Sequence, residues 1–225
     1  MKAVLFDVDF TLIYPGARFD AGGYEAFGRR HGLSVDPSRF EDAVVAAAPE
    51  LEVGTDPTYR PEMFVRYVRR LFQEMGGGGP GLEACAREVY DEWAACQHFS
   101  LYDDVRPALE RLRARGLRLG LVSNTHRCLD TFRRHFDLNP FIDAGVSSSD
   151  HGYMKPHPSI FEAALRALDV DAAEALMVGD SLSHDVSGAH QAGMRAVLLD
   201  RAGETTDSPP EVPVINTLHA LADVL

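Results

Sequence analysis

Two aspartates stand directly after the first apolar run of the chain and are separated by one residue. Asp7 and Asp9 follow 3–6 and begin the segment Asp7-Val8-Asp9-Phe10-Thr11. In such a pair, one carboxylate can attack phosphorus as a nucleophile, and the second can protonate the leaving oxygen and later activate water. The positions of Asp7 and Asp9 fit this pair of roles.

Polar side chains also follow two later apolar runs. Ser123 and Asn124 come after 119–122, and Asp180 comes after 176–178. Ligands bind at the carboxyl ends of parallel strands, so these positions are candidates for a shared site. Each one alone has a structural explanation, because Asp, Ser and Asn are favoured at turns and helix N-caps. Their recurrence at three strand ends favours a site.

The carboxylates of this group predict a bound cation. Asp7, Asp9 and Asp180 would repel one another if they lay close together, and a cation is the simplest remedy. Hard oxygen ligands, with neither Cys nor His among them, favour Mg²⁺ over zinc. Mg²⁺ is therefore the predicted cofactor.

Lysine usage gives an independent signal. The chain contains only Lys2 and Lys155, and the other basic side chains among the 22 are arginines. Lys155 stands in Gly152-Tyr153-Met154-Lys155-Pro156, between a predicted strand and a predicted helix. A compact ammonium is not interchangeable with a planar guanidinium. We therefore interpret Lys155 as a site residue, the alternative being a solvated loop lysine.

Short apolar runs alternate with helical patterns over the second half of the chain. The predicted strands are 3–8, 117–122, 142–146, 175–178 and 196–199. The predicted helices between them are 106–115, 128–136, 159–168 and 183–192. This alternation predicts an α/β protein with a parallel sheet.

About a hundred residues separate the first two predicted strands, far more than a single crossover helix needs. The amphipathic stretches within this insert are 23–31, 40–48, 61–75 and 82–96. We therefore expect a discontinuous core of 1–14 plus 99–225 and a helical cap domain of 15–98.

The amino-acid composition disfavours several classes of binding partner. Acidic residues outnumber basic ones by 34 to 22, and the net charge of −12 disfavours nucleic acid and anionic membranes. Nothing approaches the ~18 continuous apolar residues of a membrane span. Three cysteines without C-x-x-C spacing are typical of reduced thiols. We expect a cytoplasmic protein, either a monomer or a homodimer, that acts on a small molecule.

Four segments resemble, in order, the motifs of the haloacid dehalogenase (HAD) superfamily of phosphohydrolases. They are Asp7-Val8-Asp9-Phe10-Thr11-Leu12, Ser123-Asn124, Lys155-Pro156, and Gly179-Asp180-Ser181 through Asp185. The resemblance implies a phosphatase of subfamily I. Its fold would be a Rossmann-like parallel sheet with helices on both faces and an inserted four-helix C1 cap that reads the substrate.

The resemblance also implies roles for these residues. Asp7 would be the nucleophile and Asp9 the general acid and base. Mg²⁺ would be bound by Asp7, by the main-chain carbonyl of Asp9 and by Asp180, with Asp185 acting through water or orienting Lys155. Ser123 and Asn124 would hold the phosphoryl group, and Lys155 would neutralise it.

Two positions depart from the family pattern. Phe10 stands where glycine is most frequent, and we expect ordinary backbone angles there or a small local adjustment. His184 stands where asparagine is frequent, and we expect a surface role or a place in the first turn of a helix.

The predicted activity is Mg²⁺-dependent hydrolysis of a small phosphorylated metabolite through an aspartyl-phosphate. A sugar-phosphate mutase uses the same core residues and remains an alternative. Asp9 argues against a haloacid dehalogenase, and a catalytically inactive binding protein would be favoured by the loss of a core residue. The substrate cannot be inferred from the sequence, and Arg18, Tyr59 and Arg60 are only weak candidates for contacting it.

Overall fold

A computed structural model describes residues 1–54, 56–203, 205 and 209–225 of the chain. It divides into two compact units, which are considered separately below. The first contains Met1–Tyr14, Asp56–Tyr59 and Leu101–Leu225, and the second contains Pro15–Thr55 and Arg60–Ser100.

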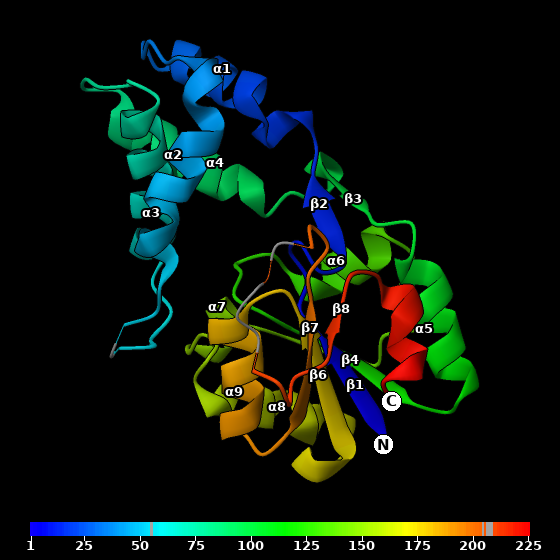
Figure 1. The fold of residues 1–225 in the computed structure, drawn as a ribbon. Helices are drawn as coiled ribbons and strands as arrows, with labels where there is room; N and C mark the ends of the chain where they lie inside the picture. The colour runs from blue at the N-terminus through cyan, green and yellow to red at the C-terminus, as the bar shows by residue number, and fades with distance from the viewer. Residues whose placement is uncertain (55, 204, 206–208) are drawn as a thin grey trace. The chain divides into compact units, whose positions relative to one another are not determined.

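The first unit is built on a six-stranded sheet in which every pair is parallel (Figure 1). Its strands are β1 (Ala3–Phe6), β4 (Arg118–Ser123), β5 (Ala144–Ser147), β6 (Ala175–Gly179), β7 (Arg195–Leu199) and β8 (Val214–Ile215), in the order β5-β4-β1-β6-β7-β8. The predicted α/β class is confirmed. The prediction did not include β8, which has only two residues.

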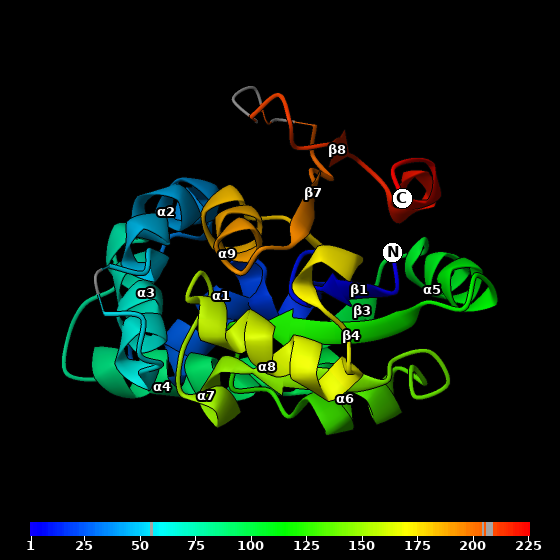
Figure 2. The same cartoon turned by 90° about the horizontal axis from the view of Figure 1, so that it is seen from below.

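Helices cover both faces of this sheet, as Figures 1 and 2 show. The α-helices are α5 (Val105–Ala114), α6 (Leu129–His135), α7 (Ser148–His151), α8 (Pro158–Leu168) and α9 (Ser187–Gln191). Short helical turns span Ala172–Glu174, Leu182–Val186 and Leu218–Asp223, of which Leu182–Val186 is a π-helix. The helix predicted over 183–192 is therefore a π-turn that continues into α9.

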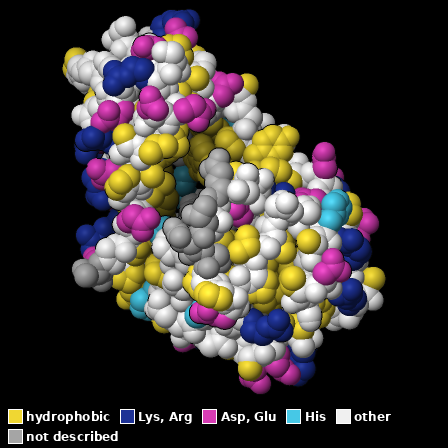
Figure 3. Space-filling model, viewed as in Figure 1, with side chains coloured by type: hydrophobic (Ala, Val, Ile, Leu, Met, Phe, Trp, Pro, Cys, Tyr) yellow, Lys and Arg dark blue, Asp and Glu magenta, His cyan; other side chains and the backbone are white. Residues whose placement is uncertain are grey.

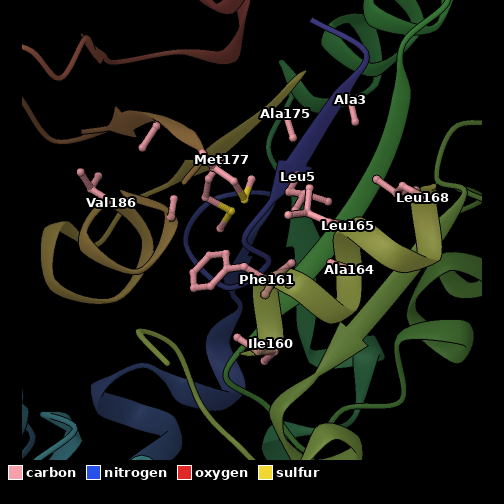
Figure 4. Close-up of a cluster of buried hydrophobic side chains, with 14 of the residues drawn as sticks. Ala3, Leu5, Ile160, Phe161, Ala164, Leu165, Leu168, Ala175, Met177 and Val186 are labelled. Atoms are coloured by element: carbon pink, nitrogen blue, oxygen red, sulfur yellow. The ribbon is translucent and has the colours of Figure 1, made fainter. Parts of the chain in front are cut away.

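The core explains why β1 is a continuous apolar run. All four of its residues are fully buried, as expected for a central parallel strand covered on both faces. Ala3 and Leu5 point toward α8, where they pack with Phe161 and Leu165 in one cluster (Figure 4). The alternate residues of the strand face the opposite side of the sheet.

The second unit is helical. It contains α1 (Ala21–Arg30), α2 (Phe40–Ala47), α3 (Pro61–Glu74) and α4 (Leu82–Trp93), with short 3₁₀ turns at Ala17–Phe19, Pro37–Arg39, Ala48–Leu51 and Cys96–His98. The helix α3 packs against both α2 and α4. Arg18 donates hydrogen bonds of 2.6 and 2.5 Å to Glu92, so its guanidinium is already engaged inside this unit.

Two of the four connections between the units are extended. β2 (Ile13–Pro15) and β3 (Phe99–Leu101) form a two-stranded sheet where the chain first leaves the first unit and where it finally returns to it. Neither strand was predicted, because three residues are too few to show a period of two.

The segment Asp56–Tyr59 belongs to the first unit although it lies within the predicted insert. Tyr59 N donates to the carbonyl of Gly152 at 2.9 Å, and Met154 N donates to the carbonyl of Pro57 at 2.8 Å. Thr58 and Tyr153 form an antiparallel bridge between these bonds. The pairing is made by main-chain groups, so no side-chain pattern could have predicted it.

The surface of the chain carries charges of both signs. On the face shown in Figure 3, Lys and Arg side chains lie among Asp and Glu side chains. Within the described ranges, no helix combines the length and the apolar character that crossing a membrane requires.

The packing of α9 predicts that Gly188 cannot be replaced by alanine without loss of stability. A Cβ at Gly188 would lie 2.5 Å from the Phe161 ring and 2.9 Å from the Pro156 Cα. Gly188→Ala should lower the free energy of unfolding by about 1 to 3 kcal/mol in a denaturant titration, since overpacking forces the neighbours apart.

Gly22 is the matched control, because it is also the second residue of a helix, α1. Its Cβ would meet only the Asp20 Oδ1, at 3.4 Å. Gly22→Ala should be neutral or stabilise by up to ~1 kcal/mol. Equal effects of the two substitutions would contradict the packing argument.

Candidate active site

Asp7 lies at the carboxyl end of the central strand. β1 runs between β4 and β6, and its last residue, Phe6, pairs with Leu121 on one side and Val178 on the other. Asp7 N continues this ladder by donating to the Val178 carbonyl at 2.9 Å. The side chain of Asp7 is buried at the sheet edge where β4 and β6 also end.

Lys155 is buried between two carboxylates. Its Nζ donates to Asp7 Oδ1 at 2.5 Å and to Asp185 Oδ1 at 2.6 Å, and only 2% of the residue is exposed. Burial opposes the charged ammonium, but the attraction of Asp185 and Asp7 outweighs it and raises the pKa of Lys155 above its usual value. The alternative reading as a solvated loop lysine does not fit this position.

Asn124 holds the main chain of Lys155. Its Oδ1 accepts from Lys155 N at 2.7 Å, and its Nδ2 donates to the Lys155 carbonyl at 3.0 Å. The carboxamide therefore positions the lysine loop, and its predicted contact with a phosphoryl group stays a prediction. Ser123 ends β4 beside it and is buried.

Three carboxylates meet at this edge. One oxygen each of Asp7, Asp180 and Asp185 lies within 4.8 Å of the others. Burial raises the pKa of Asp7 well above the usual range; the ammonium of Lys155 opposes this shift, and the charges of Asp185 and Asp180 add to it. Asp180 is exposed as a whole residue, yet the burial of its carboxyl group, and then the charge of Asp185, raise its pKa to about 6. Such a set of oxygen donors fits a hard divalent cation.

The position of the Asp185 side chain depends on Gly179, which has no room for a side chain of its own. Asp185 Oδ2 accepts from Ser181 N at 3.1 Å, and a Cβ at Gly179 would lie 2.2 Å from this oxygen. Any side chain at Gly179 would therefore displace Asp185. The sequence pattern indicated no role for Gly179 or for Thr11, whose hydroxyl donates to Asp180 Oδ1 at 3.3 Å.

Asp9 faces a buried arginine. Arg127 Nη1 lies 3.1 Å from Asp9 Oδ1 and 3.0 Å from Asp9 Oδ2. Arg127 is fully buried, whereas the Asp9 side chain retains 18% exposure. Arginine is the habitual cation of this chain, so nothing in the sequence distinguished this one.

The expectation of ordinary backbone angles at Phe10 is wrong. Its φ is +61°, in the left-handed region, which costs a bulky residue about 1 to 2 kcal/mol. The reason is local: the loop turns back so that Phe10 N donates to the Ile13 carbonyl at 2.7 Å. Strain of this kind is found where a functional loop must keep one shape.

His184 lies in the first turn of the helical segment after β6. Its main-chain N–H donates to the Ser181 hydroxyl at 3.1 Å, so Ser181 caps this turn.

Comparison with known proteins gives the same class as the site. The model of the family described as "haloacid dehalogenase-like hydrolase" matches residues 1–193. The chain is 31% identical to "Ribulose-1,5-bisphosphate 5-phosphatase" of Halopiger xanaduensis, over 99% of this chain and 98% of that one. It is 43% identical to "Glyceraldehyde 3-phosphate phosphatase" of Pyrococcus abyssi, over 88% and 80% of the two chains.

Among solved structures, the HAD phosphatase from Thermococcus onnurineus aligns over 100% of this chain and 97% of its own, with 26% identity and a TM-score of 0.68. The chain therefore belongs to the haloacid dehalogenase-like hydrolase family, which confirms the resemblance of its motifs. Within that family it is an enzyme of the phosphatase type.

The raised pKa of Asp180 predicts how a cation stabilises the fold at different pH values. Its pKa rises from 3.8 to about 6 on folding, so the folded chain binds more protons than the unfolded chain between these values. Through this group, the stability of the metal-free protein therefore falls as the pH rises from about 4 to 6. The melting temperature in Mg²⁺ minus that in EDTA should grow over the same interval.

Asp180→Asn gives the comparison for this experiment. The neutral amide removes one negative charge from the site, so it should raise the melting temperature in EDTA at pH 7. It should also reduce the increase in melting temperature that Mg²⁺ causes. A Mg²⁺ effect that stayed constant from pH 4.5 to 7.5 in the wild type would contradict the charge argument.

Proposed function

We propose that this enzyme hydrolyses a small phosphomonoester through a covalent aspartyl-phosphate on Asp7, with Mg²⁺ bound in the site. The observation that carries the proposal is the contact of a buried lysine with the buried Asp7 at the end of the central strand. The named activities of the relatives, which are phosphatases of small phosphorylated sugars and trioses, support it.

The chain offers a suitable place for the cation. Asp7, Asp180 and Asp185 would hold Mg²⁺, together with the main-chain carbonyl of Asp9, and Asp185 would act directly or through water. When bound, Mg²⁺ would offset the negative charge of the phosphoryl group and align it with the nucleophile.

The side chains then account for two transfers. In the first, a carboxylate oxygen of Asp7 bonds to phosphorus, the bond from phosphorus to the leaving oxygen breaks, and Asp9 gives that oxygen a proton. In the second, Asp9 takes a proton from water, the water oxygen bonds to phosphorus, and the bond to Asp7 breaks. Asp7 is regenerated, and inorganic phosphate leaves.

Lys155, Ser123 and Asn124 would support both transfers. The ammonium of Lys155 would offset charge on the phosphoryl oxygens. Because it touches the Asp7 carboxylate, it would also favour the ionised form of Asp7 against the effect of burial. Ser123 and Asn124 would donate to the phosphoryl group from the end of β4. We further propose that the helices of the second unit act as the cap that selects the substrate.

The direct test is Asp7→Asn. The isosteric amide should leave the melting temperature close to that of the wild type but abolish phosphate release and the trapped phosphoenzyme, because an amide is a poor nucleophile. A panel of sugar phosphates, triose phosphates and nucleotides with Mg²⁺ supplies the substrate, and EDTA should stop turnover.

Asp169→Asn is the matched control, because the Asp169 side chain is 96% exposed. It should keep full activity. A covalent phosphate found on any residue other than Asp7 would remove the basis of the proposal, and so would full activity in EDTA.

Lys155→Arg tests whether charge alone is enough at this position. The lysine ammonium fits between two carboxylates at 2.5 and 2.6 Å, where a planar guanidinium with five donors would displace one of them. A displacement of ~1 Å can reduce turnover about a hundredfold, so we expect kcat to fall by at least that order.

The chain provides its own control in Lys2, the other lysine, which is exposed and pairs with Glu174. Lys2→Arg should leave kcat unchanged. Normal turnover of Lys155→Arg, with normal melting, would show that Lys155 serves as a generic cation.

A further inference from the structure

Arg127 brings a buried positive charge to the carboxylate that would act as acid and base. The residue is 1% exposed, and its Nη1 contacts both oxygens of Asp9, at 3.1 and 3.0 Å. The main-chain N–H of Arg127 donates to the Thr125 hydroxyl at 3.0 Å, and this hydrogen bond stabilises the turn between β4 and α6. The turn that follows Ser123 and Asn124 therefore also delivers this guanidinium.

Stability alone does not explain the placement of this arginine. Taking a guanidinium out of water is unfavourable unless an anion compensates it, and replacing a buried ion pair by apolar side chains is often neutral or stabilising. The anion that Arg127 contacts is the carboxylate that must move protons under the proposed function. The pair therefore calls for a functional explanation.

The geometry of the contact leaves Asp9 able to react. A carboxylate offers about four lone-pair positions, and a single nitrogen placed between the two oxygens of Asp9 uses one on each. The remaining positions stay available to a leaving group or to water, and 18% of the Asp9 side chain is exposed. Such a contact restricts rotation of the carboxylate without covering it.

We infer that Arg127 is a positioning residue that sets the orientation of the Asp9 carboxyl for both proton transfers. This inference rests on the proposed function. The guanidinium holds the carboxylate from the protein side, and Asp9 presents its free lone pairs to the leaving oxygen and then to water. Arg127 itself gains and loses no proton.

The experiment compares leaving groups in the first transfer. Single-turnover formation of the phosphoenzyme is measured with two substrates. One is an alkyl phosphate, whose leaving oxygen needs a proton, and the other is p-nitrophenyl phosphate, whose leaving oxygen departs with little protonation. Arg127→Met should slow the alkyl reaction at least about tenfold and the aryl reaction much less. Asp9→Asn should show the same pattern with a larger loss.

Combining the substitutions tests whether the two residues act as one unit. Adding Arg127→Met to Asp9→Asn should cause little further loss, because the group that Arg127 orients is already disabled. Arg127→Lys should restore part of the alkyl rate, since the charge is kept. This variant also provides the test if Arg127→Met fails to fold.

Arg133→Met is the matched control. Arg133 is a largely buried arginine of α6 that donates to the Ile142 carbonyl and to Asp130. It should affect the alkyl and aryl reactions equally or leave both unchanged.

Two outcomes would overturn the inference while leaving the proposed function intact. In one, Arg127→Met slows phosphoenzyme formation equally with the two substrates; in the other, the rate losses of Arg127→Met and Asp9→Asn add in the double variant. If Asp9→Asn itself showed no dependence on the leaving group, Asp9 would not be the acid, and the inference would fall together with that assignment.

Discussion

The concentration of negative charge at the end of β1 is the constraint on which the rest of the site depends. Asp7, Asp180 and Asp185 bring carboxylate oxygens within 4.8 Å of one another. Such a group persists in a folded protein only when cations and donors are arranged around it. Lys155 bridges two of the three carboxylates, and Thr11 donates to the third.

The supporting residues follow from this charge arrangement. Asn124 fixes the main chain that carries Lys155, and Gly179 leaves the space that Asp185 occupies. The same logic extends to Asp9, whose carboxylate meets the buried guanidinium of Arg127. Each carboxylate at this edge thus has a partner, with Lys155 serving two of them, and the partners come from different loops of the chain. A parallel sheet suits this task because its carboxyl ends lie side by side.

The sheet could be predicted because each of its longer strands is encoded by a short apolar run of neighbouring residues. Apolar runs such as 3–6 and 176–178 indicate buried strands directly, and the aspartates that come after them contrast with these runs. Arg127 could not be predicted, because its role depends on a partner 118 residues away that only folding brings close. Phe10 misled the prediction for another reason: its left-handed backbone is imposed by a hydrogen bond of the loop against the preference of the side chain.

The main-chain pairing of Asp56–Tyr59 with Gly152–Met154 limits how this protein can be taken apart or recombined. The chain passes between the two units four times, so the helical unit is not a cassette bounded by two junctions. A chimera that exchanged residues 15–98 for the helices of a relative would also remove the segment that pairs with the loop leading to Lys155. Modular exchange in this chain therefore has to keep residues 56–59 with the sheet and join the foreign helices on either side of them.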